Sequence, residues 1–126
     1  MQPRILVLDD EKLIRWSLNQ IFRQEGFDVD LASSVDEALR FARTHSYGLI
    51  LADLEVCGEQ ADAFFPALTG QQLGAKVIIM TALTSDLAEL QLGDFKAYRI
   101  IEKPFVSEEI RAAVKAALNP IQGGLP

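Results

Sequence analysis

LVLDDE, at residues 6–11, places three apolar residues directly before three acids. A short apolar run that ends at charged residues is typical of a buried strand, and here it predicts a strand over Ile5–Leu8. In an open parallel sheet, binding sites form outside the carboxyl ends of the strands. The acids that follow this strand are therefore candidates for a functional site.

Working outward, apolar runs alternate with segments of helical period along the whole chain. The predicted further strands are Phe27–Leu31, Tyr47–Ala52, Lys76–Met80 and Ala97–Ile101. The predicted helices are 11–25, 34–45, 61–72, 84–92 and 107–118, with Pro66 inside the third and a loop at 54–60. Continuous apolar strands between amphipathic helices predict an α/β fold. We expect a flavodoxin-like, doubly wound, five-stranded parallel sheet of order 2-1-3-4-5, covered by five helices.

Length and charge limit the possible functions. The chain has 126 residues, which suits one domain, and we expect that domain over 1–118 with a linker-like tail at 119–126. Twelve basic and eighteen acidic residues give a net charge of −6, which argues against direct binding of nucleic acid by this segment. No apolar stretch approaches the roughly 20 residues that span a bilayer, and the N-terminus does not resemble a signal peptide. With the single Cys57, these features favour a cytoplasmic protein without membrane attachment.

Polar side chains also follow the third, fourth and fifth predicted strands, namely Asp53, Thr81 and Lys103-Pro104. Each has an ordinary structural explanation by itself. Asp53 could be a turn residue, Thr81 a capping hydroxyl and Lys103 a solvated surface lysine. Several carboxylates, a hydroxyl and a lysine at one edge of a sheet form a chemically coherent set.

Carboxylates held close together repel one another, and a hard divalent cation relieves that repulsion. Mg²⁺ prefers oxygen ligands, so we expect Asp10 and Asp53 to bind it directly and Asp9 through a water, with the backbone carbonyl of Glu55 as a further ligand. A free oxygen of Asp53 could then attack phosphorus. Lys103 would neutralise charge on the phosphoryl oxygens and Thr81 would donate a hydrogen bond to them.

Four motifs together resemble the receiver domain of two-component response regulators: LVLDDE at 6–11, LILAD at 49–53, IIMTA at 78–82 and EKPF at 102–105. The resemblance covers residues 5–118. It implies that Asp53 is the phosphoacceptor, that Asp9 and Asp10 serve the metal, and that Lys103 pairs with the phosphate. It further implies that Thr81 is the switch hydroxyl and that the backbone of Ala82 contacts the phosphate. The segment DDEKLIRWSL also looks like receivers of the nitrogen-regulation type.

The resemblance implies partners as well. The phosphoryl donor would be a histidine kinase or a phosphotransfer protein, and the output would be an appended domain or an effector, with transcription as the expected process. A receiver homodimer is a further possibility. The surface around 84–92 and 97–101 would change on phosphorylation. Trp16 falls off the apolar stripe of its predicted helix, which suits either a partly buried rim residue or a docking contact for the kinase.

The sequence departs from the family pattern at the switch. An aromatic residue usually stands three positions before the lysine, where this chain has Ile100. Tyr98 lies two residues earlier, and the segment 93–103 is about three residues longer than is common. Thr81, Ile100 and Tyr98 are therefore the predicted switch residues, with Phe95 as an alternative aromatic.

Two other classes of function compete with this interpretation. A haloacid-dehalogenase-type phosphatase also uses an aspartate and Mg²⁺, but its Asp-x-Asp motif is absent here because Glu55 follows Asp53-Leu54. A phosphorylation-independent interaction module would keep the fold without the chemistry. The intact set of Asp53, Thr81 and Lys103 argues against that second alternative. We expect no substrate turnover beyond the phosphorylation and dephosphorylation of Asp53 itself.

Overall fold

The computed structural model describes residues 3–72 and 74–118. Within them, five parallel strands form one sheet of order β2-β1-β3-β4-β5, as predicted. The strands are β1 (Arg4–Leu8), β2 (Asp28–Ala32), β3 (Leu49–Asp53), β4 (Lys76–Thr81) and β5 (Arg99–Glu102). The first strand is near the centre, so the acids that follow it lie beside the end of β3.

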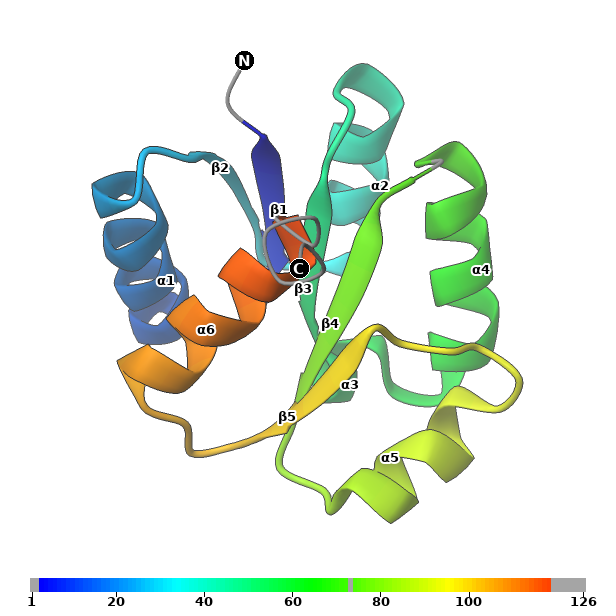
Figure 1. Ribbon diagram of the computed structural model, residues 1–126. Helices are drawn as coiled ribbons and strands as arrows, with labels where there is room; N and C mark the ends of the chain where they lie inside the picture. The colour runs from blue at the N-terminus through cyan, green and yellow to red at the C-terminus, as the bar shows by residue number, and fades with distance from the viewer. Residues whose placement is uncertain (1–2, 73, 119–126) are drawn as a thin grey trace, which may run out of the picture.

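Helices cover both faces of the sheet (Figure 1). The five long helices are α1 (Lys12–Gln24), α2 (Val35–Thr44), α4 (Ala61–Gln71), α5 (Ser85–Leu92) and α6 (Ser107–Leu118). Figure 1 shows α1 and α6 on one face, and α2, α4 and α5 on the other. The predicted helices are thus present, and α4 forms despite Pro66 inside it.

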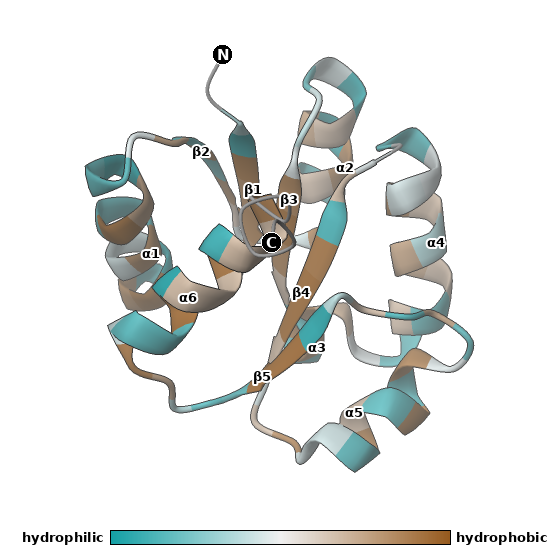
Figure 2. Ribbon diagram, in the orientation of Figure 1, coloured by the Kyte–Doolittle hydropathy of each residue, from teal (hydrophilic) through white to brown (hydrophobic). Residues whose placement is uncertain are grey.

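Alternate residues of each strand enter the two hydrophobic layers. In β1, Leu6 and Leu8 pack under α2 and α4, whereas Ile5 and Val7 pack under α1 and α6. All four are completely buried. Figure 2 shows the apolar strands between helices whose outer faces are polar. This two-sided burial explains why the strands appear in the sequence as continuous apolar runs.

The prediction of a loop at 54–60 was wrong. A single helical turn, α3 (Leu54–Cys57), and a 3-10 turn, η1 (Gly58–Gln60), follow β3 directly. The side chain of Asp53 accepts a hydrogen bond from the backbone N–H of Glu55 at 3.3 Å and so caps α3. The turn fixes the direction in which the Glu55 side chain leaves the backbone.

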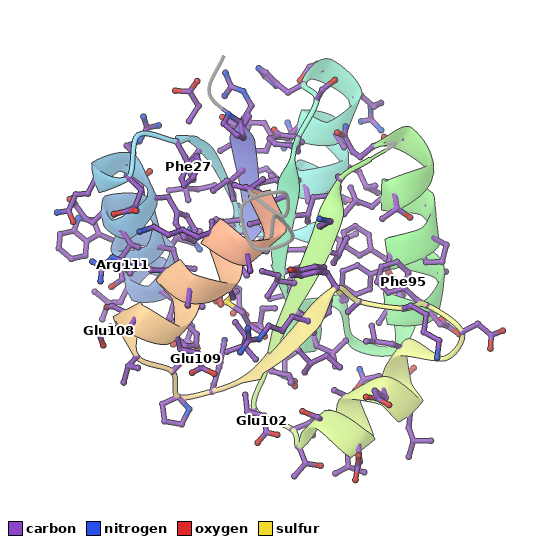
Figure 3. The ribbon with its side chains drawn as sticks, in the orientation of Figure 1. Phe27, Phe95, Glu102, Glu108, Glu109 and Arg111 are labelled. Atoms are coloured by element: carbon purple, nitrogen blue, oxygen red, sulfur yellow. The ribbon has the colours of Figure 1, made fainter. Side chains whose placement is uncertain are left out.

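The strands β3 and β5 begin later than predicted, because side chains or loops replace the backbone pairing there. The backbone N–H of Tyr47 donates to the buried side chain of Gln72 at 2.8 Å, and β3 begins at Leu49. The last strand begins at Arg99 rather than Ala97, after an irregular segment at 93–98. In that segment Phe95 points toward α4 (Figure 3), and its ring stacks on Phe65 with 5.2 Å between centroids.

The predicted tail at 119–126 lies outside the described residues, so the proposed domain limits stay a prediction. Among residues 3–72 and 74–118, no helix is both long and apolar enough to cross a membrane.

Candidate functional site

The candidate site lies at the carboxyl edge of the sheet, where β1, β3, β4 and β5 end side by side. The parallel register pairs Leu8 with Ala52, Asp53 with Met80, and Thr81 with Glu102. This register places the polar residues that follow each strand next to one another. The backbone N–H of Lys103 also donates to the carbonyl of Thr81 at 2.7 Å, which fixes the end of β5.

Three carboxylates form a cluster at this edge. Oxygen atoms of Asp9, Asp10 and Asp53 all lie within 4.8 Å of one another. Asp9 is completely buried and Asp53 is 3% exposed, while Asp10 faces solvent. Several carboxylate oxygens around one point, with an open side for water, match the preferences of a hard divalent cation such as Mg²⁺. The donor set therefore fits the metal expected from the sequence.

Lys103 lies next to two of these three carboxylates. Its ammonium is 3.1 Å from a carboxylate oxygen of Asp9 and 3.4 Å from one of Asp53. Burial by itself lowers the pKa of Lys103, but the hydrogen bond to Asp9 and the charge of Asp53 outweigh burial and raise the pKa above its ordinary value. The lysine therefore stays positively charged at neutral pH beside Asp53. The peptide bond from Lys103 to Pro104 is cis.

The carboxyl of Asp53 is the most perturbed acid of the site. Burial, helped by the side chain of Glu55, raises the pKa of Asp53 to about 7, although the charge of Lys103 opposes the shift. Without a metal, this carboxyl is partly protonated near neutral pH. A bound divalent cation would favour the charged form. The charge of Asp53 thus depends on its neighbours.

Glu55 holds the polar groups at the end of β4. The Thr81 hydroxyl donates to one Glu55 carboxylate oxygen at 2.6 Å, and the backbone N–H of Ala82 donates to the other at 3.0 Å. Burial raises the pKa of Glu55, but these hydrogen bonds outweigh it and keep the pKa below the ordinary value. The Thr81 side chain is completely buried and accepts from the N–H of Leu83 at 3.0 Å.

The predicted switch residues are not all brought to the site. Ile100 pairs with Ile79 in the sheet and packs against the hydrophobic layer under α5. Tyr98 lies near the start of β4, where its N–H donates to the carbonyl of Val77 and its ring centroid lies 5.1 Å from the ammonium of Lys76. Four residues of strand, about 13 Å, separate Val77 from Thr81. Tyr98 therefore does not lie beside Thr81, and its role in a switch stays a prediction.

Two contributors to the site were missed from the sequence. The sequence suggested only the backbone carbonyl of Glu55 as a ligand, whereas its side chain accepts the hydrogen bonds from Thr81 and Ala82. Arg15, one turn into α1, donates from its guanidinium to the backbone carbonyl of Asp9 at 2.8 Å. The available signals were an acid two residues after Asp53 and a basic residue six positions after Asp9. Neither signal indicates a site residue until the strands are known to lie side by side.

The sequence matches the family model described as "Response regulator receiver domain" over residues 5–115. The chain is 32% identical over 119 residues to sporulation initiation phosphotransferase F of Bacillus subtilis, covering 94% of this chain and 95% of that protein. It is 31% identical over 119 residues to the alkaline phosphatase synthesis transcriptional regulatory protein PhoP of the same organism, covering 94% of this chain and 50% of that protein. The DNA-binding transcriptional regulator NtrC of a Bradyrhizobium species is 28% identical over 114 residues, covering 90% of this chain and 24% of that protein. The chain thus spans half or less of the length of most of the curated transcriptional regulators it matches.

Solved structures agree in fold. A two-component response regulator from Clostridium difficile superposes with a TM-score of 0.85 at 22% identity, covering 95% of this chain and 98% of that one. A response regulator from Burkholderia pseudomallei, solved with a phosphorylated aspartic acid and a calcium ion, gives a TM-score of 0.80 at 24% identity, covering 98% of this chain and 72% of that one. Family match, strand order and acidic cluster lead to the same conclusion: the chain belongs to the receiver domains of two-component response regulators.

Proposed function

We propose that Asp53 is the residue of this receiver domain that accepts the phosphoryl group. The observation that carries the proposal is its position, buried, within 4.8 Å of the other two acids and 3.4 Å from the Lys103 ammonium. Mg²⁺ held by Asp10 and Asp53, with Asp9 through a water and the Glu55 carbonyl as a further ligand, would supply a positive charge that favours the ionised carboxylate.

The proposed transfer needs few protein groups. An oxygen of Asp53 forms a bond to phosphorus as the bond from phosphorus to the donor histidine nitrogen breaks. The bonding electron pair stays on the imidazole of the donor. Lys103 pairs with the negative oxygens of the phosphoryl group, and Thr81 and the N–H of Ala82 donate hydrogen bonds to them. No substrate is turned over apart from this acyl phosphate and its hydrolysis.

The proposed donor is a histidine kinase or a phosphotransfer protein that docks beside α1. A groove of about 570 Å³ lies against the site, lined by apolar side chains that include Ile14, Leu18 and Phe105. On the outer side of the same helix, Leu13 is 78% exposed and Trp16 is 60% exposed. An apolar groove that reaches Lys103, on a helix with further exposed apolar side chains, suits a partner that must bring its histidine to Asp53.

The proposed output is a change at the surface formed by α5 and β5. Thr81 lies beside Glu102 at the edge of the sheet, and Glu102 accepts hydrogen bonds from the backbone and hydroxyl of Ser85 at the start of α5. Figure 3 shows Glu102 at the end of β5. A shift of Thr81 toward a phosphoryl group would therefore reach the first turn of α5. An output domain, an effector or a second receiver would read that change.

Labelling with acetyl phosphate tests the central proposal. In the presence of Mg²⁺, the protein is expected to incorporate one acid-stable, base-labile phosphoryl group, and Asp53→Asn is expected to abolish it. Asp94→Asn, at an exposed position, serves as the control and should label normally. In the same assay, Trp16→Ala should label normally from acetyl phosphate but more slowly from a kinase. Label retained in Asp53→Asn would refute the assignment.

A further inference from the structure

The Glu55 carboxylate accepts hydrogen bonds from two groups at the end of β4. Its two oxygens take the Thr81 hydroxyl at 2.6 Å and the Ala82 N–H at 3.0 Å. A carboxylate presents two negatively charged acceptor oxygens, as one face of a phosphoryl group does. These two donors are also the ones that the proposed function assigns to the phosphoryl group.

We propose that Glu55 is an internal competitor for this subsite, and that phosphorylation has to displace it. The inference rests on the proposed role of Asp53. Each of the two donors has one hydrogen to give, so the carboxylate and a phosphoryl group cannot both hold them at full strength. Glu55 also adds a negative charge beside the one that an incoming phosphoryl group brings, and this opposes its entry.

The fold directs the Glu55 side chain to this position and also leaves it free to turn into solvent. The helical turn of α3 starts directly after Asp53, so the side chain of Glu55 points toward the end of β4. Glu55 is an exposed residue, whereas Thr81 is completely buried. The carboxylate can therefore turn outward into water without disturbing the core, and the Thr81 hydroxyl stays at the subsite. Glu55 is a positioning residue, since it acts on the phosphoryl group through these two donors.

The competition predicts a measurable change in apparent affinity. A carboxylate that fills the subsite about four-fifths of the time lowers the apparent affinity for any competing anion about fivefold. Glu55→Gln keeps the shape but removes the charge. With Mg²⁺ present, it is expected to bind beryllium fluoride about fivefold more tightly than the wild type. Glu59→Gln, at an exposed position of η1, is the matched control and should bind as the wild type does.

A double-mutant cycle separates competition from simple charge repulsion. In a Thr81→Val background one of the two donors is gone, so Glu55 is held less firmly. There Glu55→Gln should gain less than about twofold. An equal gain in both backgrounds would show repulsion at a distance and overturn the proposal, as would no gain in the wild-type background. Thr81→Ala replaces Thr81→Val if the latter does not fold.

The hydrogen bond between Glu55 and the Ala82 N–H can be measured without any ligand. Its test is therefore independent of the proposed phosphorylation of Asp53. In the ligand-free protein, the Ala82 amide proton is expected to move upfield in Glu55→Gln and to stay in place in Glu59→Gln. An unmoved signal would overturn the inference. If instead the Ala82 signal moves but neither the wild type nor Asp53→Asn responds to beryllium fluoride, the proposed role of Asp53 fails while the contact stands.

Discussion

The carboxyl of Asp53 lies in a place that disfavours its charge, and this has a thermodynamic consequence at the scale of one residue. Its pKa is about 7 in the folded protein and near 3.8 when the chain is unfolded. The folded state therefore holds the proton more tightly, so without metal the contribution of Asp53 to stability is present below about pH 4 and is lost as the pH rises toward 7.

Asp53→Asn removes this penalty. In EDTA at pH 8, we expect the variant to have a free energy of unfolding about 2 kcal/mol higher than the wild type, and near pH 4 the difference should shrink toward zero. Urea unfolding at both pH values measures it. Asp94→Asn should differ from the wild type by less than about 0.5 kcal/mol at either pH. A difference between Asp53→Asn and the wild type that did not depend on pH would contradict burial of the Asp53 charge as its cause.

Residue identity at the strand ends was predictable, but side-chain partners were not. The sequence indicates Asp9, Asp10, Asp53, Thr81 and Lys103 because each follows an apolar run, and the structure brings all five to one edge. The hydrogen bonds of Glu55 depend on the short turn α3, which has no periodic signal in four residues. The position of Tyr98 beside Val77 was not predictable, because it depends on the path of 93–98, where Phe95 stacks on Phe65.

At the scale of elements, α4 contains two residues that disfavour helices, Pro66 and Gly70. A methyl group added at Gly70 would meet no atom within 4 Å, and its backbone is helical. Gly70→Ala is therefore expected to raise the free energy of unfolding by about 0.5–1 kcal/mol, because alanine loses less backbone entropy in a helix. Thermal or urea unfolding measures the gain.

Gly58 provides the opposite case. A methyl group there would also meet nothing, but its φ of +58° lies in the left-handed region. Gly58→Ala should lower stability by about 1 kcal/mol. Equal effects of Gly58→Ala and Gly70→Ala would mean that free space, rather than backbone conformation, decides both.

At the scale of the whole molecule, the acidic cluster links stability to metal. If Mg²⁺ binds the folded state alone, a concentration of ten times its Kd adds about 1.4 kcal/mol to the free energy of unfolding. For a domain of this size that corresponds to a rise in Tm of roughly 3–6 °C. Asp10→Asn should lose most of this rise while still folding, since Asp10 is exposed. An undiminished rise in Asp10→Asn, measured calorimetrically, would place the metal elsewhere.

The overall architecture was the most predictable level, because five apolar runs separated by amphipathic segments admit few arrangements of a parallel sheet. Strand order and the two covered faces came out as expected. The boundaries that moved are those settled by contacts between distant segments. Examples are the Gln72 side chain that binds the N–H of Tyr47, and the packing of Phe95 under α4.

That packing of Phe95 has a mechanical side. The segment 93–98 joins α5 to β5, and the contact of Phe95 with Phe65 attaches it to α4. A movement of α5 is therefore coupled to α4 through this segment. If α5 is displaced, either α4 travels with it or the Phe95 ring leaves its seat on Phe65, which forfeits roughly 1 kcal/mol of aromatic packing. A displacement of α5 alone therefore has to break this ring contact first.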